Sequence, residues 1–165
     1  MRWLWLSLIV VGVDQWTKSL AGAHLHYGIP QAVVPGLNLT LVHNTGAAFS
    51  LLRDAGGWQR VFFISLALTI SVVLVLWLRR VLPGQRWLPV ALALILGGAL
   101  GNLCDRIFLG YVVDFLDVYV GHWHWPAFNV ADASISVGAV MLAVDALWLE
   151  PRREQRTGDQ NQSQN

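Results

Sequence analysis

The sequence predicts an all-α membrane bundle of four transmembrane helices that carries a small extracytoplasmic β platform. Four apolar runs, separated by more polar segments, are each about long enough to cross a bilayer. Only 13% of the residues are charged, against roughly 25% in a soluble domain. Most of the nine tryptophans stand near the ends of these runs, where an amphipathic ring suits the headgroup region. Residues 1–150 are therefore expected to form a single integral membrane domain, with helices at about 3–20, 61–78, 87–104 and 131–149.

The first run, about residues 3–20, has two interpretations. A basic start and the small residues Ala21–Ala23 are compatible with a cleaved signal peptide. However, Asp14, Gln15 and Lys18 interrupt the run where a signal peptide is uniformly apolar, and three later runs would hold the chain in the membrane in any case. We therefore favour a retained helix.

The β platform is predicted from about residues 23–57 and 107–126. Between residues 37 and 42, leucines alternate with Asn38, Thr40 and Val42, and this period of two is typical of a strand with one apolar face. Tyr111–Val118 is a second candidate strand. The glycines and prolines that interrupt the first stretch are typical of turns.

The other three runs are also predicted to be helices, and they differ in charge, in glycine content and in capping residues. Residues 61–78 carry no charge and would span roughly 27 Å as a helix, close to the bilayer's hydrocarbon thickness of about 30 Å. Residues 87–104 contain Gly97 and Gly101, a G-x-x-x-G spacing that permits close contact between helices. The run at 131–149 begins just after Asn129, with Asp132 in its first turn, as expected for a capped helix start.

The basic residues predict the orientation, because Lys and Arg are enriched in cytoplasmic loops. One side of a four-span arrangement receives Arg2, Arg79, Arg80, Arg86, Arg152, Arg153 and Arg156, and the other receives Arg53, Arg60 and Arg106. Both termini should therefore be cytoplasmic. Residues 151–165 are polar and rich in Gln and Asn, so we expect a disordered cytoplasmic tail.

Polar residues from distant segments are expected at one depth of the membrane. Asp14 and Lys18 lie towards the outer end of the first helix, and Asn102, Asp105 and Arg106 reach the same level on the third. The fourth helix begins there with Asn129 and Asp132. A charge at mid-membrane depth costs at least about 2.5 kcal/mol, so such a cluster is a candidate functional site.

Each polar residue also has a structural interpretation. Asn129 and Asp132 can serve as a helix cap, Asp14 with Lys18 as an internal ion pair, and Asp105 with Arg106 as an interfacial charge pair. Asp117 and Asp145 are expected to reach water or to snorkel towards it. His122 and His124 are a weak metal signal without further ligands, and an exposed aromatic belt is the favoured reading of that stretch. The sequence predicts neither a metal site nor a cofactor.

Asp114 fits a purely structural role least well. It stands among apolar residues, with Arg106 as the nearest base in sequence, so burial should raise the pKa of its carboxyl group. Asp132 is the expected partner, because the strand from Tyr111 returns to the membrane surface before the fourth helix begins. Two neighbouring carboxylates can share a proton, which lets one activate water while the other donates to a carbonyl. The sequence thus favours peptide hydrolysis by an activated water molecule.

Four motifs carry a resemblance to a known family. They are "DQWTK" at 14–18, "VHNTGAAFS" at 42–50, "GGALGNLCDRIFLGYVVDFLD" at 97–117 and "WPAFNVADASI" at 125–135. In this order and spacing they resemble the bacterial lipoprotein signal peptidases, also called signal peptidase II or prolipoprotein signal peptidases. That family consists of intramembrane aspartic proteases with four transmembrane helices.

The resemblance implies a reaction, a place and a set of roles. It implies that Asp114 and Asp132 are the catalytic dyad, on the periplasmic side of the bacterial inner membrane. The substrate would be a prolipoprotein with a diacylglyceryl-modified cysteine, cut just before that cysteine, and cyclic peptides of the globomycin type would be inhibitors. The family's other polar positions, which line or brace the site, match Asp14, Lys18, Asn44, Asn102, Arg106 and Asn129.

Further expectations concern the turn at 44–49, the partners and the competing functions. Gly46 permits a sharp turn there and Phe49 offers an apolar cover, so this turn is a candidate lid. We expect a monomer in contact with membrane lipid, and the formal net charge of +1 gives no reason to expect nucleic acid. A proton or ion conductor and a non-catalytic scaffold or lipid-binding subunit are the alternative functions, but a conductor needs polar groups across the whole membrane.

Overall fold

The computed structural model describes residues 2–46 and 58–149. The predicted tail at 151–165 and residues 47–49 of the predicted lid lie outside the described residues. The elements in chain order are α1 (Leu4–His24), β1 (Gln31–Val34), β2 (Leu37–Asn44), α2 (Trp58–Arg80), α3 (Trp87–Phe108), β3 (Val112–Val120), β4 (Trp123–His124) and α4 (Val130–Val144), which continues as a π-helical segment (Asp145–Leu149).

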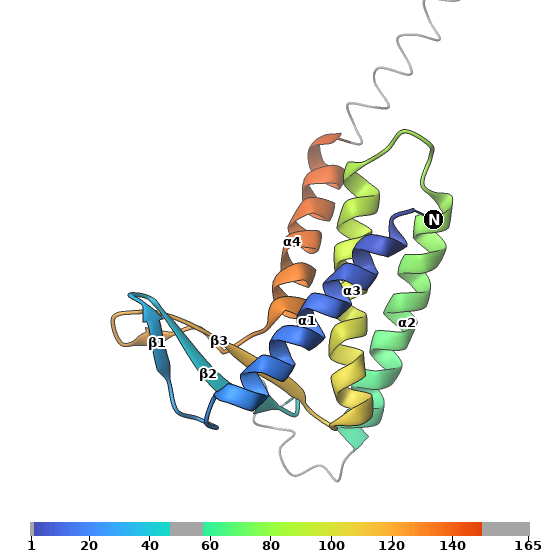
Figure 1. Cartoon of the computed structure of the whole chain (residues 1–165). Helices are drawn as coiled ribbons and strands as arrows, with labels where there is room; N and C mark the ends of the chain where they lie inside the picture. The colour runs from blue at the N-terminus through green and yellow to red at the C-terminus, as the bar shows by residue number, and fades with distance from the viewer. Residues whose placement is uncertain (1, 47–57, 150–165) are drawn as a thin grey trace, which may run out of the picture.

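Helix α3 is the centre of the bundle. Helices α1, α2 and α4 each pack against it, and α1 also contacts α4. Successive helices run in opposite directions, so that the N-terminus, the α2–α3 connection and the end of α4 lie at one end of the bundle (Figure 1). The sheet lies beside the other end, where α1 finishes and α4 begins (Figure 1).

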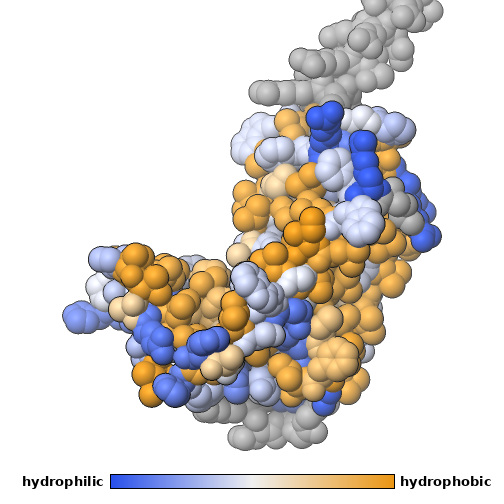
Figure 2. Space-filling view, in the orientation of Figure 1, coloured by the Kyte–Doolittle hydropathy of each residue, from blue (hydrophilic) through white to orange (hydrophobic). Residues whose placement is uncertain are grey.

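Three described helices are long and apolar enough to cross a membrane, namely α2, α3 and the segment Val130–Leu149. Apolar residues form a broad zone around the middle of the bundle, and hydrophilic residues gather at the end where α1 begins and α4 ends (Figure 2). Helices with membrane-spanning character and a small sheet are thus confirmed.

Helix α1 is apolar on its outside and polar on its inside. Its buried residues include Ser7, Asp14 and Lys18, whereas Trp5 and Trp16 are exposed. This polar inner face lowers the mean hydropathy of α1, which explains physically why it is absent from the three apolar spans. The fourth transmembrane span therefore stays a prediction.

Glycines let the helices approach α3 closely. A Cβ atom on Gly97 would lie 2.7 Å from Cβ of Val10 in α1, and one on Gly98 would collide with the Ala131 carbonyl oxygen of α4. A Cβ atom on Gly101 would lie 2.6 Å from Oδ2 of Asp14. The close contact predicted from the G-x-x-x-G spacing is present, and it brings the polar face of α1 against α3.

The sheet is antiparallel, with the strands in the order β1-β2-β3-β4, and helices α2 and α3 lie in the chain between β2 and β3. The two strands predicted from sequence correspond to β2 and β3, and the short strands β1 and β4 were not predicted. Leu41, Val113 and Phe115 pack with Ala21 of α1 in one apolar cluster. This cluster fixes the sheet to the end of α1, so the ends of β2 and β3 nearest the bundle face the start of α4.

Candidate active site

The predicted polar residues meet at the end of the bundle next to the sheet. Five elements contribute them: α1, β2, α3, β3 and the start of α4. Their hydrogen bonds and ion pairs connect Asp14, Lys18, Asn44, Asn102, Asp114, Asn129 and Asp132 in one network.

Of the two aspartates predicted to form a dyad, Asp114 is more deeply buried than Asp132. Its side chain lies on β3, and the residue is 2% exposed. Oδ2 accepts a 2.9 Å hydrogen bond from Nδ2 of Asn44, and Oδ1 accepts a 2.7 Å bond from Nδ2 of Asn129. Burial raises the pKa of Asp114 to about 6, and the charge of Asp132 adds to the rise while the amide of Asn44 opposes it.

Asp132 lies in the first turn of α4 and has two roles in the network. It forms a capping box with Asn129, whose Oδ1 accepts a 2.9 Å bond from the Asp132 backbone N–H. Oδ1 of Asp132 also accepts a 2.7 Å hydrogen bond from Nδ2 of Asn102. The predicted helix cap is therefore confirmed, and the same carboxylate is available to a site.

Asn129 connects the two aspartates. Its side-chain amide donates to Asp114, while its backbone N–H donates to Oδ2 of Asp132 over 3.3 Å. The residue is fully buried, and its amide also contacts Oδ1 of Asn102 at 3.3 Å. One residue thus fixes both carboxylates relative to each other.

Lys18 is the buried cation behind this pair. Its Nζ lies 2.8 Å from Oδ2 of Asp14, 2.9 Å from Oδ2 of Asp105 and 2.9 Å from Oδ1 of Asn102. An ammonium group has three donors, so all of them have acceptors here. The predicted ion pair between Asp14 and Lys18 is confirmed and is part of a larger cluster.

The two carboxylates paired with Lys18 also hold the backbone beside the proposed dyad. Oδ1 of Asp14 accepts a 2.9 Å bond from the N–H of Ala131, the residue before Asp132. Oδ2 of Asp105 accepts a 3.0 Å bond from the N–H of Val113, the residue before Asp114. Lys18 therefore links the positions of both aspartates through one ionic cluster.

The predicted charge pair between Asp105 and Arg106 is wrong. Asp105 faces inward to Lys18, while Arg106, the next residue on α3, lies on a different face of the helix. Its guanidinium lies over the ring of Phe63 at 5.0 Å and donates to the Asn102 carbonyl oxygen at 3.3 Å. Arg106 forms no ion pair with any residue that the structure describes.

Asn44 and Gly46 adjoin Asp114 at the end of β2. Gly46 has a φ of 91°, and its N–H donates to Oδ1 of Asn44 over 2.9 Å, while Nδ2 of Asn44 donates to Asp114. A Cβ atom on Gly46 would collide with the ring of Phe63. Both its backbone conformation and its surroundings therefore favour glycine.

Two aspartates that were predicted to reach water are buried. Asp145 is one of them, and Asp117 is 7% exposed. Oδ2 of Asp117 accepts hydrogen bonds from Asn38 and Thr40, both at 3.2 Å, and Oδ1 pairs with Nδ1 of His124 at 2.7 Å. The prediction failed because the cross-strand partners of Asp117 in the sheet are not visible in the sequence.

His124 has a structural role within the platform. It pairs with Asp117, and its ring stacks on that of Tyr119. Within residues 2–46 and 58–149, no group of three His, Cys, Asp or Glu side chains is arranged to hold a metal ion.

With this geometry in view, a comparison with known sequences decides the family. A family described as "Signal peptidase (SPase) II" has a sequence model that matches residues 6–148. The chain belongs to the signal peptidase II family.

Relatives of this signal peptidase II are similar along most of their length. A "Lipoprotein signal peptidase" of Acinetobacter baumannii (strain ATCC 17978) is 57% identical over 151 residues, which cover 92% of this chain and 86% of the relative. One from Hydrogenovibrio crunogenus is 50% identical over 96% of this chain and 92% of the relative. One from Pseudomonas aeruginosa (strain UCBPP-PA14) is 52% identical over 88% and 87%.

Two solved structures, each described as a "Bacterial membrane enzyme", share the fold. They have TM-scores of 0.78 and 0.80 at 31% sequence identity, and they cover 88% and 89% of this chain and 87% and 93% of their own. The chain is accordingly a peptidase and a membrane enzyme, and the family predicted from its motifs is confirmed.

Sequence reasoning missed the roles of two residues in this signal peptidase II. Asp105 was assigned to a surface pair, and Gln15 was given no role. Nε2 of Gln15 donates to Oδ1 of Asp105 at 2.8 Å and to the Gly101 carbonyl oxygen at 3.1 Å. The i, i+3 spacing of Asn102 and Asp105 on one helix face was the available signal for Asp105.

Proposed function

We propose that this signal peptidase II removes the signal peptide of diacylglyceryl-modified prolipoproteins, cutting before the lipidated cysteine, with Asp114 and Asp132 as its catalytic dyad. The observation that carries the proposal is the connection of the two carboxylates, from separate elements, through Asn129. The names of the relatives and the family match support the substrate class.

The proposed chemistry is a single water addition with a shared proton. Asp132, as a carboxylate, takes a proton from water while the water oxygen attacks the scissile carbonyl carbon. Asp114, whose pKa is raised to about 6 chiefly by burial, donates its proton to the carbonyl oxygen. As the tetrahedral diol collapses, one of its hydroxyl protons returns to Asp114, the C–N bond breaks, and the leaving amine takes the proton held by Asp132. No metal or cofactor enters these steps.

The remaining residues are proposed to hold this pair in place. Asn44 and Asn129 donate to Asp114, and Asn102 donates to Asp132. Asp14 and Lys18 act one step further away, through the backbone contact of Asp14 with Ala131. Arg106 and Gly46 lie beside this group, against Phe63. The turn at 44–49 is proposed as a lid of the site.

We further propose that α1 is the fourth transmembrane span. Apart from Ser19 and His24 near its end, its exposed residues are apolar, and Ser7, Gln15 and Lys18 contact α3, which is the distribution expected in lipid rather than in water. Residues 1–150 would then form one membrane domain of the bacterial inner membrane, with both termini cytoplasmic and the site on the periplasmic side. Among the described residues, four arginines, Arg2, Arg79, Arg80 and Arg86, lie at the end of the bundle where α1 begins, against Arg60 and Arg106 at the other end, and this excess supports the orientation.

The same site is the proposed target of cyclic peptide inhibitors of the globomycin type, and we propose that the enzyme works as a monomer. A proton conductor is disfavoured, because the described polar network lies at one end of the bundle and α2 buries only Ser71 and Leu74.

The test is cleavage of a diacylglyceryl-modified prolipoprotein by purified protein in detergent. Asp114→Asn and Asp132→Asn should each lower turnover by at least about 100-fold, the lower range for loss of general acid–base catalysis. Asp117→Asn makes the same change on the same strand outside the network and should cleave at nearly the wild-type rate. Retained cleavage in either dyad variant, with helical content unchanged by circular dichroism, would contradict the assignment.

A further inference from the structure

A groove separates α1 from α2 on the side of the bundle away from α4. Both helices pack against α3, so a strip of α3 between them is left as the floor of a cavity of about 520 Å³. The floor is formed by Leu96 and Leu100, and the walls include Leu8 of α1 and Val72 of α2. This volume lies within the range of about 300–1,000 Å³ that is typical of ligand sites.

The length of the groove matches one leaflet of a bilayer. Along α2 it is lined from Leu68 to Arg79, and the eleven steps between these residues span roughly 16 Å of helix. The hydrocarbon core of a bilayer is about 30 Å thick, so the groove covers about half of it. It extends to the end of α2 that lies away from the sheet and from the proposed dyad (Figure 1).

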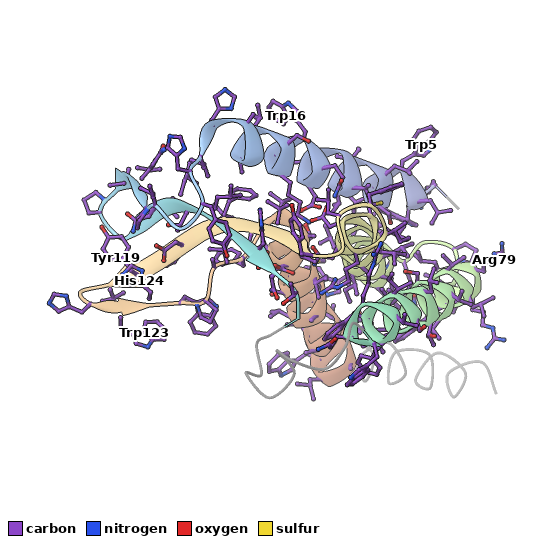
Figure 3. The ribbon with its side chains drawn as sticks, turned by 90° about the horizontal axis from the view of Figure 1, so that it is seen from below. Trp5, Trp16, Arg79, Tyr119, Trp123 and His124 are labelled. Atoms are coloured by element: carbon purple, nitrogen blue, oxygen red, sulfur yellow. The ribbon has the colours of Figure 1, made fainter. Side chains whose placement is uncertain are left out.

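The end of the groove is cationic and the rest is almost entirely apolar. Arg79 lines this end, is exposed, and has no hydrogen-bond or ion-pair partner among the residues that the structure describes. Trp5 of α1, 71% exposed, projects on the same side of the molecule as Arg79 (Figure 3). Tryptophan and arginine in this arrangement are typical of the headgroup level, where a guanidinium binds phosphate.

We propose that this groove binds one anionic phospholipid of the leaflet remote from the dyad, with an acyl chain along Leu96 and Leu100 and the phosphate at Arg79. The length of the groove and its single cationic end support this occupant. A signal-peptide helix fits less well, because its positively charged start would meet Arg79. The site is independent of the proposed dyad, since it lies at the other end of the bundle.

The charge is tested by a pair of neighbouring arginines. Arg79 lines this groove, whereas Arg80 lines a different cavity between α2 and the start of α3. Phosphatidylglycerol is titrated into delipidated protein and bound lipid is counted by native mass spectrometry. Arg79→Ala should weaken the binding at least about tenfold, equivalent to ~1.4 kcal/mol, and Arg80→Ala should leave it within about twofold of wild type. Equal loss in the two variants, or equal affinity for phosphatidylcholine, would overturn the proposal.

The groove itself is tested by a pair of neighbouring valines. Val72, 58% exposed, lines the groove, and Val73, 53% exposed, lines the other cavity. Val72→Trp should fill the groove and abolish the rise in thermal midpoint that phosphatidylglycerol gives, and Val73→Trp should retain it. The same rise in both variants would contradict an acyl chain in this groove. Cleavage activity and circular dichroism show that each variant is folded.

Ser71 distinguishes a lipid from a polypeptide occupant. Its buried Oγ lines the groove and has no hydrogen-bond partner among the described residues. An acyl chain offers no acceptor at this depth, whereas the backbone or side chains of a bound helix would. Ser71→Ala should therefore leave phosphatidylglycerol affinity unchanged. A clear loss would contradict an acyl chain beside Ser71, and a photo-crosslink from position 72 to a second copy or to a signal peptide would assign the groove to protein instead.

Discussion

Asp114 and Asp117 lie three residues apart on β3, and both are almost fully buried, yet their carboxyl groups are shifted in opposite directions. The pKa of Asp114 is raised to about 6, chiefly by burial. Burial also acts to raise the pKa of Asp117, but the hydrogen bonds from His124, Asn38 and Thr40 outweigh it and lower the pKa.

The two pKa shifts differ because the carboxyl groups of Asp114 and Asp117 have different neighbours. Asp114 faces the bundle, where it receives two neutral amides and the like charge of Asp132. Asp117 faces the cross-strand donors of the sheet and an imidazole. A carboxylate that is enclosed without a full set of charge-stabilising partners binds its proton more tightly than an ordinary aspartate, which brings its pKa closer to neutral pH, as proton-transfer chemistry requires.

Lys18→Met is expected to have the largest effect on the free energy of unfolding. It removes the buried cation that pairs with Asp14 and Asp105 at the end of the bundle near Asp114. Asp14 and Asp105 would be left as buried carboxylates without their ion pair. Breaking a buried pair by removing one partner typically costs about 3–5 kcal/mol, and we expect the free energy of unfolding in detergent to fall by that amount.

A compensating variant sharpens this prediction. Combining Lys18→Met with Asp14→Asn and Asp105→Asn removes the uncompensated charges, so part of the lost unfolding free energy should return. If Lys18→Met alone costs less than about 1 kcal/mol, the cluster does not hold β3 and helices α1, α3 and α4 together in the way that its distances indicate.

Asn44→Ala is expected to change the pH dependence of cleavage. The amide of Asn44 lowers the pKa of Asp114, so its removal should raise that pKa further and keep the shared proton on the dyad to higher pH. The fall in kcat/KM on the alkaline side should therefore move upward, by up to about one pH unit. Asn38→Ala removes the equivalent amide from Asp117 and should leave the profile unchanged. A shift caused by Asn38→Ala, or none by Asn44→Ala, would remove the basis for treating Asp114 as the proton-sharing group.

The fold was predictable where a pattern repeats along the chain. Apolar runs defined the four helices, and the alternation at 37–42 defined β2, because both signals depend on local periodicity. The strands β1 and β4 were missed, since each is short and exists through its neighbour: Ala32 pairs with Asn38, and His124 pairs with Tyr119.

The sequence predicted which residues lie in the site, but it did not predict the hydrogen bonds and ion pairs that join them. The sequence brought Asp14, Lys18, Asn102, Asn129 and Asp132 to one depth, because helix direction fixes the level of each residue. It could not show that Asp105 turns towards Lys18 and not towards Arg106, or that Asp105 holds the N–H of Val113. Such contacts depend on how α1, α3 and β3 pack in three dimensions.

His124→Ala is expected to have the smallest effect and tests the platform end of the comparison. Because the folded-state pKa of Asp117 lies below its unfolded value, this carboxylate stabilises the fold above the unfolded pKa, and the contribution is lost as the pH falls through the folded pKa. Removing His124 should bring the pKa of Asp117 back towards its ordinary value and make thermal unfolding less dependent on pH in the acid range. At neutral pH the loss should stay below about 1 kcal/mol, because the His124 side chain is partly exposed.

His122→Ala, two residues away in the same exposed hairpin, is the control. If the pH dependence is the same in wild type and His124→Ala, then Asn38 and Thr40 alone hold the charge of Asp117, and the contrast along β3 rests on amide and hydroxyl donors without the imidazole.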